Sequence, residues 1–554
     1  MVSIECNLAI LKELLGKEIS EQEMEDTLWN LGYEVEDKEG EEWKIDVTPD
    51  RPDLFSVFGI ARLLRCYLLG RKKEYKFEES NLEVRVDKAV EHVRPYTVCA
   101  VVKDLKLTEE TLKSLISLQE KIHLSYARKR KKAAIGIYPL EAIKGPILFT
   151  AKKPEEIKFV PLDFDVELSG REILERHPKG REYGYLLKGK ERYPIFIDSE
   201  GKILSMPPII NSKDTGKVTL DTKEVFIECS GPNLKFLNKV LNILISNLAE
   251  IGKICTVRIK YPDKELITPK PEEKVIPLEL GYANRLLGMN ISKEDAKKLL
   301  ERMEYRVENL EDGALKVAVP WYRVDVFSQV DIIEDLGKAY GISNLLPEFP
   351  SVPGIGKKSE KSFKIDRIRE LMLGYGFQEL YNMVLSSFED QIEKMNLGKE
   401  ENVLKIEGAI ESSINLARIW LLPELLKFLV RNQHHQFPIK VFEIGEVIFP
   451  DERTENKARE EIHLSAAILN SKVGYEDISG VILTLFKILE RKIEFRRTSH
   501  PSFIEGRVAE IMVDGNRIGI LGELHPKVLK NFGIDFPVVG AEIDLSFIFG
   551  YEGA

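Results

Sequence analysis

The stretch Val319-Pro-Trp-Tyr-Arg-Val-Asp-Val-Phe-Ser-Gln-Val-Asp-Ile-Ile-Glu-Asp-Leu-Gly-Lys-Ala-Tyr-Gly341 is the part of the chain around which the rest is organised. It predicts the end of a strand and a turn, followed by a helix that begins near Ser328. Four large residues recur at helical spacing and define one face of that helix: Val330, Ile333, Leu336 and Tyr340.

The opposite face of this helix is acidic. Asp331, Glu334 and Asp335 are spaced at i, i+3 and i+4, so their carboxylates should gather on one side of the helix. Asp325 precedes them in the turn. Four carboxylates in so short a stretch require cations nearby.

A related stretch occurs earlier in the chain. A shift of 272 residues superposes residues 14–70 on residues 286–342 without a gap, and Arg51-x-Asp53 then matches Arg323-x-Asp325. We therefore expect one small module of helices and strands to occur twice. The first copy keeps the scaffold residues but lacks the three acids of the helix, so folding of the module should not require them. The residues at those positions are Gly59, Arg62 and Leu63.

The composition is that of a protein with several globular domains. The 554 residues are 43% hydrophobic, and 81 Lys and Arg stand against 91 Asp and Glu, so any RNA contact must be local. No apolar run is long enough for a membrane helix, and the N-terminus lacks a signal-peptide pattern, which predicts a cytoplasmic protein without a membrane segment. The five scattered cysteines argue against a zinc site and a disulfide framework.

Changes in composition divide the chain into four predicted regions. Residues 1–84 hold the first copy of the module and residues 266–350 hold the second. Between them, residues 85–265 alternate strands with helices, which is typical of an α+β domain. Residues 355–554 predict a further α+β domain with an antiparallel sheet. The predicted fold class is therefore α+β and multidomain.

Two further observations concern chemistry. The run from Arg128 to Lys132 contains five consecutive cations after a predicted helix. Such a run can hold an RNA backbone, but it is also typical of a solvated face, and the sequence leaves both readings open.

Self-contained catalytic motifs are missing, because the sequence has no H-E-x-x-H, no G-x-S-x-G and no dinucleotide fingerprint.

Four motifs, in this order along the chain, resemble those of the phenylalanyl-tRNA synthetase β subunit family. They are Val47-Thr-Pro-Asp-Arg-Pro-Asp-Leu54, Ser205-Met-Pro-Pro-Ile-Ile-Asn211, the acidic stretch up to Tyr340-Gly341, and Phe442-Glu-Ile-Gly445. The match covers nearly the whole chain and is similar to the shorter archaeal and eukaryotic form. It implies a subunit of an α2β2 enzyme that joins phenylalanine to tRNA(Phe) with ATP, in which the α subunit carries the aminoacylation site.

The last region resembles a class II synthetase core that lacks the two arginines of its ATP site. Phe442-Glu-Ile-Gly445 has no arginine before its glutamate, and no arginine follows Arg517. The resemblance therefore implies that this chain has no catalytic residue for aminoacylation, and that ATP is a substrate of the whole complex.

The middle region resembles the editing domain of the family, which hydrolyses tyrosine wrongly attached to tRNA(Phe). The resemblance implies Ser205, Glu228 and Ser230 as residues that line this site. The segment departs from the usual Asp-Val-Thr-Gly-Thr pattern, because Glu replaces Asp, Ser replaces Thr, and Pro232 stands at a position where a second hydroxyl is common. These changes alter the reach of the polar groups. The alternative is that these are merely polar residues at strand ends.

For the acidic stretch, the resemblance implies a magnesium ion near the α subunit, bound at Asp325, Asp331, Glu334 and Asp335. Magnesium retains several waters and rarely takes four direct carboxylates, so some of the four would act through water. A structural alternative is that Ser328 and Asp331 form a capping box, which would explain Asp331 alone. The alternative function is a free-standing RNA-binding or assembly protein that reuses the duplicated module.

Overall fold

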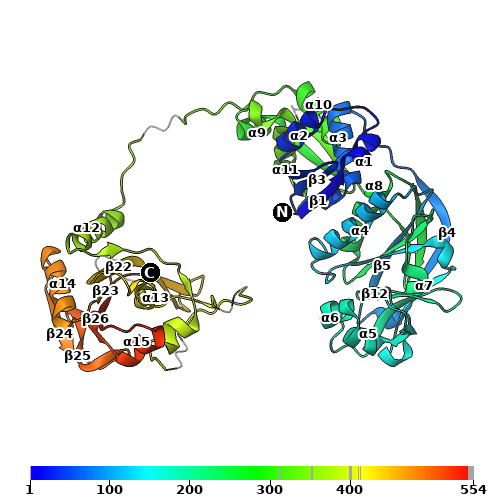
Figure 1. The fold of residues 1–554 in the computed structure, drawn as a ribbon. Helices are drawn as coiled ribbons and strands as arrows, with labels where there is room; N and C mark the ends of the chain where they lie inside the picture. Colours follow the sequence, from blue (N-terminus) through cyan, green and yellow to red (C-terminus); the bar gives the residue numbers. More distant parts are fainter. Residues whose placement is uncertain are drawn as a thin grey trace. The chain divides into compact units, whose positions relative to one another are not determined.

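In the computed structural model the described residues are 2–310, 314–350, 354–398, 402–409, 411 and 413–546. Residues 1, 311–313, 399–401, 410, 412 and 547–554 of the predicted regions lie outside them. The chain divides into two compact units, Met1–Phe349 and Pro350–Ala554 (Figure 1). Both units mix helices with sheets, so the α+β, multidomain class is confirmed. No helix in the described ranges has the length and apolarity needed to cross a membrane.

The first unit contains two small modules with the same order of elements. The first consists of β1 (Val2–Asn7), α1 (Leu8–Leu15), α2 (Glu21–Asn30), β2 (Glu34–Glu39), β3 (Glu42–Val47) and α3 (Val57–Leu69). The second consists of β16 (Lys274–Glu279), α9 (Leu280–Leu287), α10 (Lys293–Arg302), β17 (Arg306–Asn309), β18 (Ala314–Val319) and α11 (Gln329–Tyr340). Their sheets have the orders β1-β3-β2 and β16-β18-β17.

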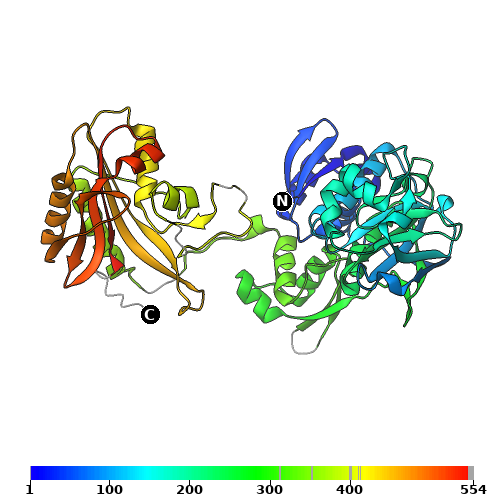
Figure 2. The ribbon, with the colours of Figure 1, turned by 90° about the horizontal axis from the view of Figure 1, so that it is seen from below.

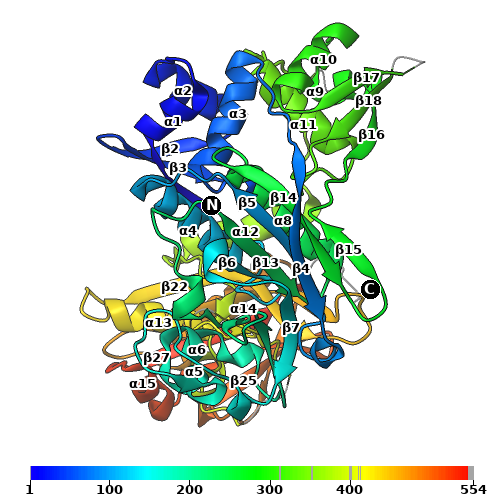
Figure 3. The same cartoon turned by 90° about the vertical axis from the view of Figure 1, so that its right-hand side faces the viewer.

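Each element of the second module begins 272 residues after its counterpart in the first. The duplication therefore extends further towards the N-terminus than the sequence match, and includes β1 and β16. The two modules pack against each other (Figure 3). The Tyr67 hydroxyl donates to the carbonyl of Ala339 at 3.3 Å, and Arg302 Nε donates to the carbonyl of Tyr67 at 2.9 Å.

The helix predicted near Ser328 is confirmed as α11. Ser328 has extended backbone angles and its hydroxyl accepts from the Val330 N–H, so it caps the helix. The buried stripe of α11 differs from the predicted face, because Val330 is 45% and Tyr340 40% exposed. The buried hydrophobic residues are Ile332, Ile333, Leu336 and Ala339.

A ten-stranded sheet separates the two modules along the chain. Its order is β12-β11-β10-β7-β4-β14-β5-β13-β6, with β15 paired to β14. Both pairings of β4, with β14 and with β7, are parallel. The strands are β4 (Phe77–Val86), β5 (Tyr96–Lys103), β6 (Ala134–Pro139), β7 (Ile147–Lys152), β10 (Tyr193–Ile197), β11 (Ile203–Met206), β12 (Ile210–Asn211), β13 (Val225–Gly231), β14 (Lys253–Lys260) and β15 (Glu265–Thr268).

Helices α4 (Glu109–Leu124) and α8 (Leu234–Leu248) pack on one face of this sheet, and the apolar core there is continuous with the cores of both modules. A separate core covers the other face and includes Phe149, Phe196 and Phe226. Three helices, α5 (Gly170–Arg176), α6 (Pro178–Tyr183) and α7 (Lys213–Gly216), and the short strands β8 (Lys158–Phe159) and β9 (Leu168–Ser169) complete this region.

The second unit is built on a seven-stranded sheet of order β19-β22-β23-β27-β26-β25-β24, in which only the pairing of β19 is parallel. The predicted antiparallel sheet is thus confirmed. Helices α12 and α14 cover one face, and α13 and α15 the other (Figure 2).

The strands of this sheet are β19 (Gln378–Glu379), β22 (Ile439–Pro450), β23 (Ala458–Leu469), β24 (Ile493–Arg497), β25 (Phe503–Val513), β26 (Asn516–Leu524) and β27 (Val538–Asp544); β20 (Leu385–Ser386) and β21 (Leu416–Ala417) form a separate pair. The helices are α12 (Glu360–Gly374), α13 (Leu422–Asn432), α14 (Tyr475–Ile488) and α15 (Pro526–Phe532).

Candidate functional site

A cavity of about 630 Å³ opens in the middle region of the first unit. Its wall comes from α4, from strands β6, β11 and β13, and from the turn after β11. Ser205 and Glu228, two of the three residues predicted to line an editing site, lie on this wall. Ser230 lies two residues further along β13 and is buried, but it does not line the cavity.

One phenol connects the polar groups of the cavity. The Tyr138 hydroxyl lies 2.7 Å from Ser205 Oγ and 3.3 Å from Glu228 Oε1, and Asn211 Oδ1 is 3.5 Å away. These groups come from β6, β11, β12 and β13, so the register of the sheet brings them together. Glu228 Oε2 is buried and has no hydrogen-bond partner in the structure. A buried oxygen without a partner is rare and points to a group that a ligand would satisfy.

The environment of Glu228 favours its protonated form. Burial raises the pKa of Glu228 to about 8, although Arg94 and the hydrogen bond from Tyr138 act in the opposite direction. The Arg94 guanidinium is buried and donates to Ser230 Oγ at 3.0 Å and to the Ser230 carbonyl at 2.6 Å. Burial lowers the pKa of Arg94 to about 10, so this arginine remains a cation at neutral pH. A protonated Glu228 can donate a hydrogen bond into the cavity.

A glycine makes room for this carboxyl group. Gly136 on β6 lies opposite Glu228 on β13. A Cβ at Gly136 would lie 2.6 Å from Glu228 Oε1 and 2.2 Å from the Tyr138 hydroxyl, so any side chain would displace both groups. Sequence reasoning did not identify Gly136, Tyr138 or Arg94. The only feature of the sequence that could have indicated Gly136 and Tyr138 is their alternation in an apolar run, which is typical of a strand.

The basic run forms part of the same wall. Three consecutive residues, Arg128, Lys129 and Arg130, have left-handed φ values of 50°, 50° and 63°. Such a conformation costs about 1–3 kcal/mol at each residue that is not glycine and persists only where contacts enforce it. Arg130 supplies those contacts. Its guanidinium donates to the carbonyl of Ile209 at 2.8 Å and to Glu120 at 2.8 Å.

The four carboxylates of the acidic stretch have different surroundings. Asp325 and Asp335 both accept from Arg323 Nη2, at 2.6 and 2.8 Å. The Tyr305 hydroxyl donates to Asp335 at 2.7 Å, and Asp335 is only 3% exposed. Burial alone would raise the pKa of Asp335, but the adjacent Arg323 lowers it below its usual range.

The other two acids lie apart from this pair. Asp331 accepts from the N–H groups of Phe327 and Ser328 at 2.8 and 2.7 Å, which confirms the capping box. Glu334 pairs with Lys338 at 2.7 Å, and its side chain is 64% exposed. The expectation that the three acids of α11 gather on one side is therefore wrong for Asp335, because Arg323 and Tyr305 hold it inside the module.

A magnesium site with all four acids as direct ligands does not fit this arrangement. Arg323 already pairs with both Asp325 and Asp335, and Asp331 caps the helix with one of its oxygens. Within the described ranges, the only group of three metal-ligating side chains whose ligand atoms lie within 4.8 Å is Glu461, His463 and Asp544, in the second unit. The magnesium site on the acidic stretch stays a prediction.

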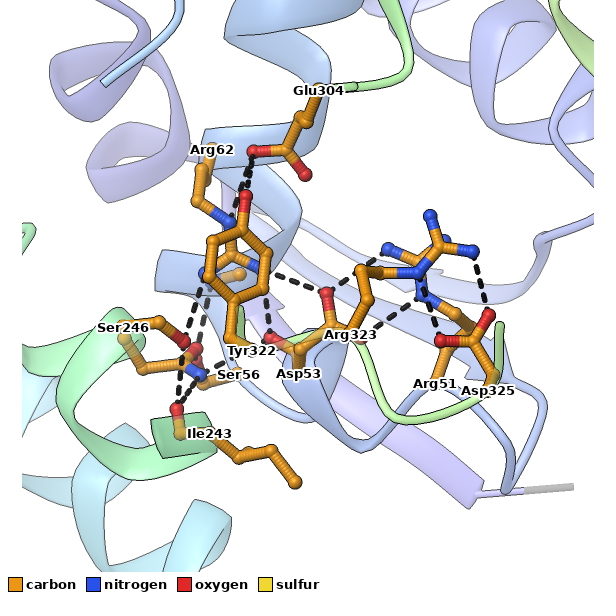
Figure 4. A network of polar contacts seen from close by, with 12 residues as sticks. Arg51, Asp53, Ser56, Arg62, Ile243, Ser246, Glu304, Tyr322, Arg323 and Asp325 are labelled. Atoms are coloured by element: carbon orange, nitrogen blue, oxygen red, sulfur yellow. Dashed lines mark hydrogen bonds and ion pairs between the residues drawn. The ribbon is translucent and has the colours of Figure 1, made fainter. Parts of the chain in front are cut away.

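The position equivalent to Glu334 in the first module is Arg62, and its side chain is buried (Figure 4). Arg62 pairs with Asp53 at 2.8 Å and with Glu304 of the second module at 3.2 Å. It also contacts Ser246 of α8 at 3.4 Å and lies over the Tyr322 ring at 4.2 Å. One guanidinium thus joins both modules to the middle region.

Glu443, the glutamate of the strand motif Phe442-Glu-Ile-Gly445, forms a buried ion pair within the second unit. Arg418 Nη1 donates to Glu443 Oε1 at 2.7 Å, and both side chains are at most 1% exposed. A Cβ on Gly445 would lie 2.4 Å from Arg418 Nη2, so the guanidinium lies directly over this glycine. Sequence reasoning did not identify Arg418.

Family models match three parts of the chain. They are described as the Phe-tRNA synthetase beta subunit B1 domain (residues 1–70), the tRNA synthetase B5 domain (276–342) and the phenylalanyl tRNA synthetase beta chain CLM domain (342–545). The two modules thus correspond closely to the first two matches.

Similar proteins cover nearly the whole chain. It is 43% identical over 545 residues to the phenylalanine–tRNA ligase beta subunit of Pyrococcus furiosus and 42% identical over 543 residues to that of Thermococcus sibiricus, with 97% of each chain covered. A crystal structure of an N-terminal fragment of the phenylalanyl-tRNA synthetase beta-subunit from Pyrococcus horikoshii matches with a TM-score of 0.59 and 42% identity, covering 61% of this chain and 99% of that one.

Proposed function

The chain belongs to the family of phenylalanine–tRNA ligase β subunits, and on that premise we propose that it works in an α2β2 complex whose α subunit carries the aminoacylation site. ATP is then a substrate of the complex. The buried pair of Arg418 and Glu443 supports this division of labour. A class II site binds phosphate through free arginines, whereas the arginine nearest to this motif is committed to an internal carboxylate.

The second part of the proposal is that the cavity beside Glu228 hydrolyses tyrosine wrongly joined to tRNA(Phe). The observation that carries it is the unpartnered Glu228 Oε2 at the wall of a cavity that is lined by both apolar and polar side chains. A site of this kind distinguishes tyrosine from phenylalanine, because phenylalanine would leave the buried polar groups without a partner.

The described residues suggest how the pocket would act. The Tyr138 phenol fixes the Ser205 hydroxyl and one Glu228 oxygen, and Arg94 fixes Ser230 behind them. The protonated Glu228 carboxyl would donate to the substrate rather than take a proton from water. Glu228 and Ser205 would therefore bind and orient the aminoacyl group, and the attacking water would need no base among these three residues.

Deacylation of Tyr-tRNA(Phe) tests the editing function. We expect Glu228→Ala to slow the reaction at least tenfold. The variant removes Glu228 Oε2, the only buried side-chain oxygen among the described lining residues that has no hydrogen-bond partner. Glu228→Gln should retain more activity than Glu228→Ala, since an amide can also donate. Unchanged deacylation by Glu228→Ala would exclude Glu228 from the site. Exposed Glu191→Gln serves as the control.

Assembly and charging test the subunit role. Co-expression with a candidate α chain should give a complex with the mass of two copies of each chain, which charges tRNA(Phe) with labelled phenylalanine. The chain without its partner should not charge the tRNA. If no α chain co-purifies and the mixture charges no better than the α chain alone, the subunit role is wrong.

A further inference from the structure

The basic turn, defined as residues Arg128 to Lys132, does not point all its cations in one direction. Arg130 is 7% exposed, and its guanidinium faces inwards to the carbonyl groups of Pro208 and Ile209. It also lies 4.3 Å from the centre of the Tyr183 ring. Arg130 therefore acts as an anchor, and the left-handed backbone of Arg128 to Arg130 sets the direction of its neighbours.

The neighbours of this anchor are exposed cations. Arg128, Lys129 and Lys131 are all exposed. Among the described residues, none of the three side chains forms an ion pair, although the chain carries 91 acidic residues against 81 Lys and Arg. About half of the other Lys and Arg side chains in residues 85–265 form ion pairs or lie over aromatic rings. These three unpaired cations are distinguished by the left-handed backbone of Arg128 and Lys129, which costs energy to hold.

The basic turn also borders the candidate editing cavity. Arg130 itself lines the cavity, and the two carbonyl groups that it holds belong to Pro208 and Ile209, which are lining residues. At the other end of the turn, the Lys132 carbonyl packs against Gly231, where a Cβ would approach it to 2.4 Å. The three exposed cations are thus anchored at both ends to the strands and loops that carry Glu228 and Ser205.

We propose that the basic turn binds phosphate groups of the RNA whose aminoacylated end enters the cavity, and that Arg130 positions it for this contact. This inference rests on the proposed editing function for the identity of the RNA. An ester on a nucleotide in the cavity places the preceding phosphates within a few nucleotide lengths of the cavity rim. Cations that meet a phosphate backbone need no base readout, so neither aromatic platforms nor amide side chains are required beside them.

The test compares two triple variants of the full chain in complex with its α subunit. One variant carries Arg128→Gln, Lys129→Gln and Lys131→Gln. The matched control carries Lys17→Gln, Arg71→Gln and Lys72→Gln, which removes the same charge from exposed residues of the first module that also form no ion pair in the described structure. Binding of uncharged tRNA(Phe) is measured by fluorescence anisotropy between about 50 and 300 mM KCl.

The variant of the basic turn should bind tRNA(Phe) at least tenfold more weakly at the lowest salt concentration. The slope of log K against log salt should fall by about 2 to 3, since each lost phosphate contact removes about 0.7 to 0.9. Single-turnover deacylation should slow at low RNA concentration and recover at saturation. The control should keep the wild-type slope.

An unchanged slope in the variant of the basic turn, or an equal decrease in the control, would overturn the proposal. The proposal would also be overturned if the variant of the basic turn lost the α subunit but kept the wild-type salt dependence of tRNA binding. The basic turn would then contact the α subunit and not the RNA. If the wild-type complex fails to deacylate Tyr-tRNA(Phe), the editing function is wrong, whereas the slope still decides whether the turn contacts RNA.

Discussion

At the scale of single residues, Glu228 is a buried carboxyl group at the wall of the candidate site. Its carboxyl group is buried, the Tyr138 hydroxyl lies 3.3 Å from one of its oxygens, and no ion pair to it occurs among the described residues. A glutamate placed in this way is held neutral, so the aspartate-to-glutamate departure from the family pattern does not simply preserve a negative charge. The residue keeps a polar group with a different reach and proton state.

The raised pKa of Glu228 predicts how stability changes with pH. Burial raises this pKa to about 8 from 4.5, so the contribution to stability is fully present below pH 4.5 and is lost as the pH rises to about 8. The loss approaches about 1.4 kcal/mol per pH unit across that window. Glu228→Gln does not titrate, so its melting temperature relative to wild type should rise from pH 5 to pH 8.

Thermal unfolding at several pH values checks this expectation. The control is Glu191→Gln, an exposed carboxyl group, which should follow the wild type at each pH. A constant difference between Glu228→Gln and wild type from pH 5 to pH 8 would show that Glu228 ionises normally in the folded protein.

At the scale of elements, helices α3 and α11 show how one scaffold serves two environments. Phe55, just before α3, is buried, as are Phe58 and Arg62 on α3. At the equivalent positions of the second module, Phe327 before α11 is 68% exposed and Val330 on α11 is 45% exposed. Gly59 permits the close approach in the first module, because a Cβ there would lie 2.1 Å from the carbonyl oxygen of Asp53. The equivalent Asp331 has no such constraint and caps its helix.

This duplication supplies a matched pair of substitutions. Arg62→Met should destabilise the chain by about 3–5 kcal/mol, because it leaves the buried Glu304 without its cation. Glu334→Met, at the equivalent position, should change stability by less than about 0.5 kcal/mol, because its ion pair with Lys338 is exposed. Urea unfolding of both variants measures the difference. Equal effects would mean that the Arg62 network does not hold the modules together.

At the scale of the whole molecule, the magnesium prediction concerns a surface that another chain would complete. Asp325 and Glu334 are the two acids of the stretch that neither cap the helix nor are fully buried. We expect Asp325→Ala with Glu334→Ala to reduce magnesium-dependent assembly with the α subunit by more than tenfold. Analytical ultracentrifugation across a magnesium titration measures this effect. If the double variant assembles like the wild type, Asp325 and Glu334 do not hold a magnesium ion needed for assembly.

The sequence predicted more of the scaffold than of the site. The repeat, the helix that begins after Ser328 and the antiparallel sheet of the second unit follow from local periodicity and turn chemistry, which a single sequence carries. The partners of Asp335 and Glu228 could not be read in this way. Arg94 lies more than a hundred residues from Ser230, and the register of a large sheet decides which side chains meet.

The wrong predictions about the buried and acidic faces of α11 have the same physical cause. Helical spacing placed Val330 and Tyr340 on the buried face and Asp335 on the acidic face, because spacing alone cannot show where a neighbouring guanidinium lies. Arg323 draws Asp335 inwards, and the buried stripe follows Ile332 and Ala339 instead. The internal copy gave a clue, because Leu63 stands opposite Asp335 and is itself buried.

The buried contacts of Arg62 have a consequence for synthesis on the ribosome. Ser246 and Glu304, which surround this guanidinium, follow it by 184 and 242 residues. At about 5–20 residues per second, the ribosome needs roughly ten to fifty seconds to make that length. During that time the N-terminal module, although translated first, has only Asp53 as an ion-pair partner for Arg62, and its apolar helix α3 is uncovered. Nascent chains halted before residue 304 should therefore be the ones that engage chaperones.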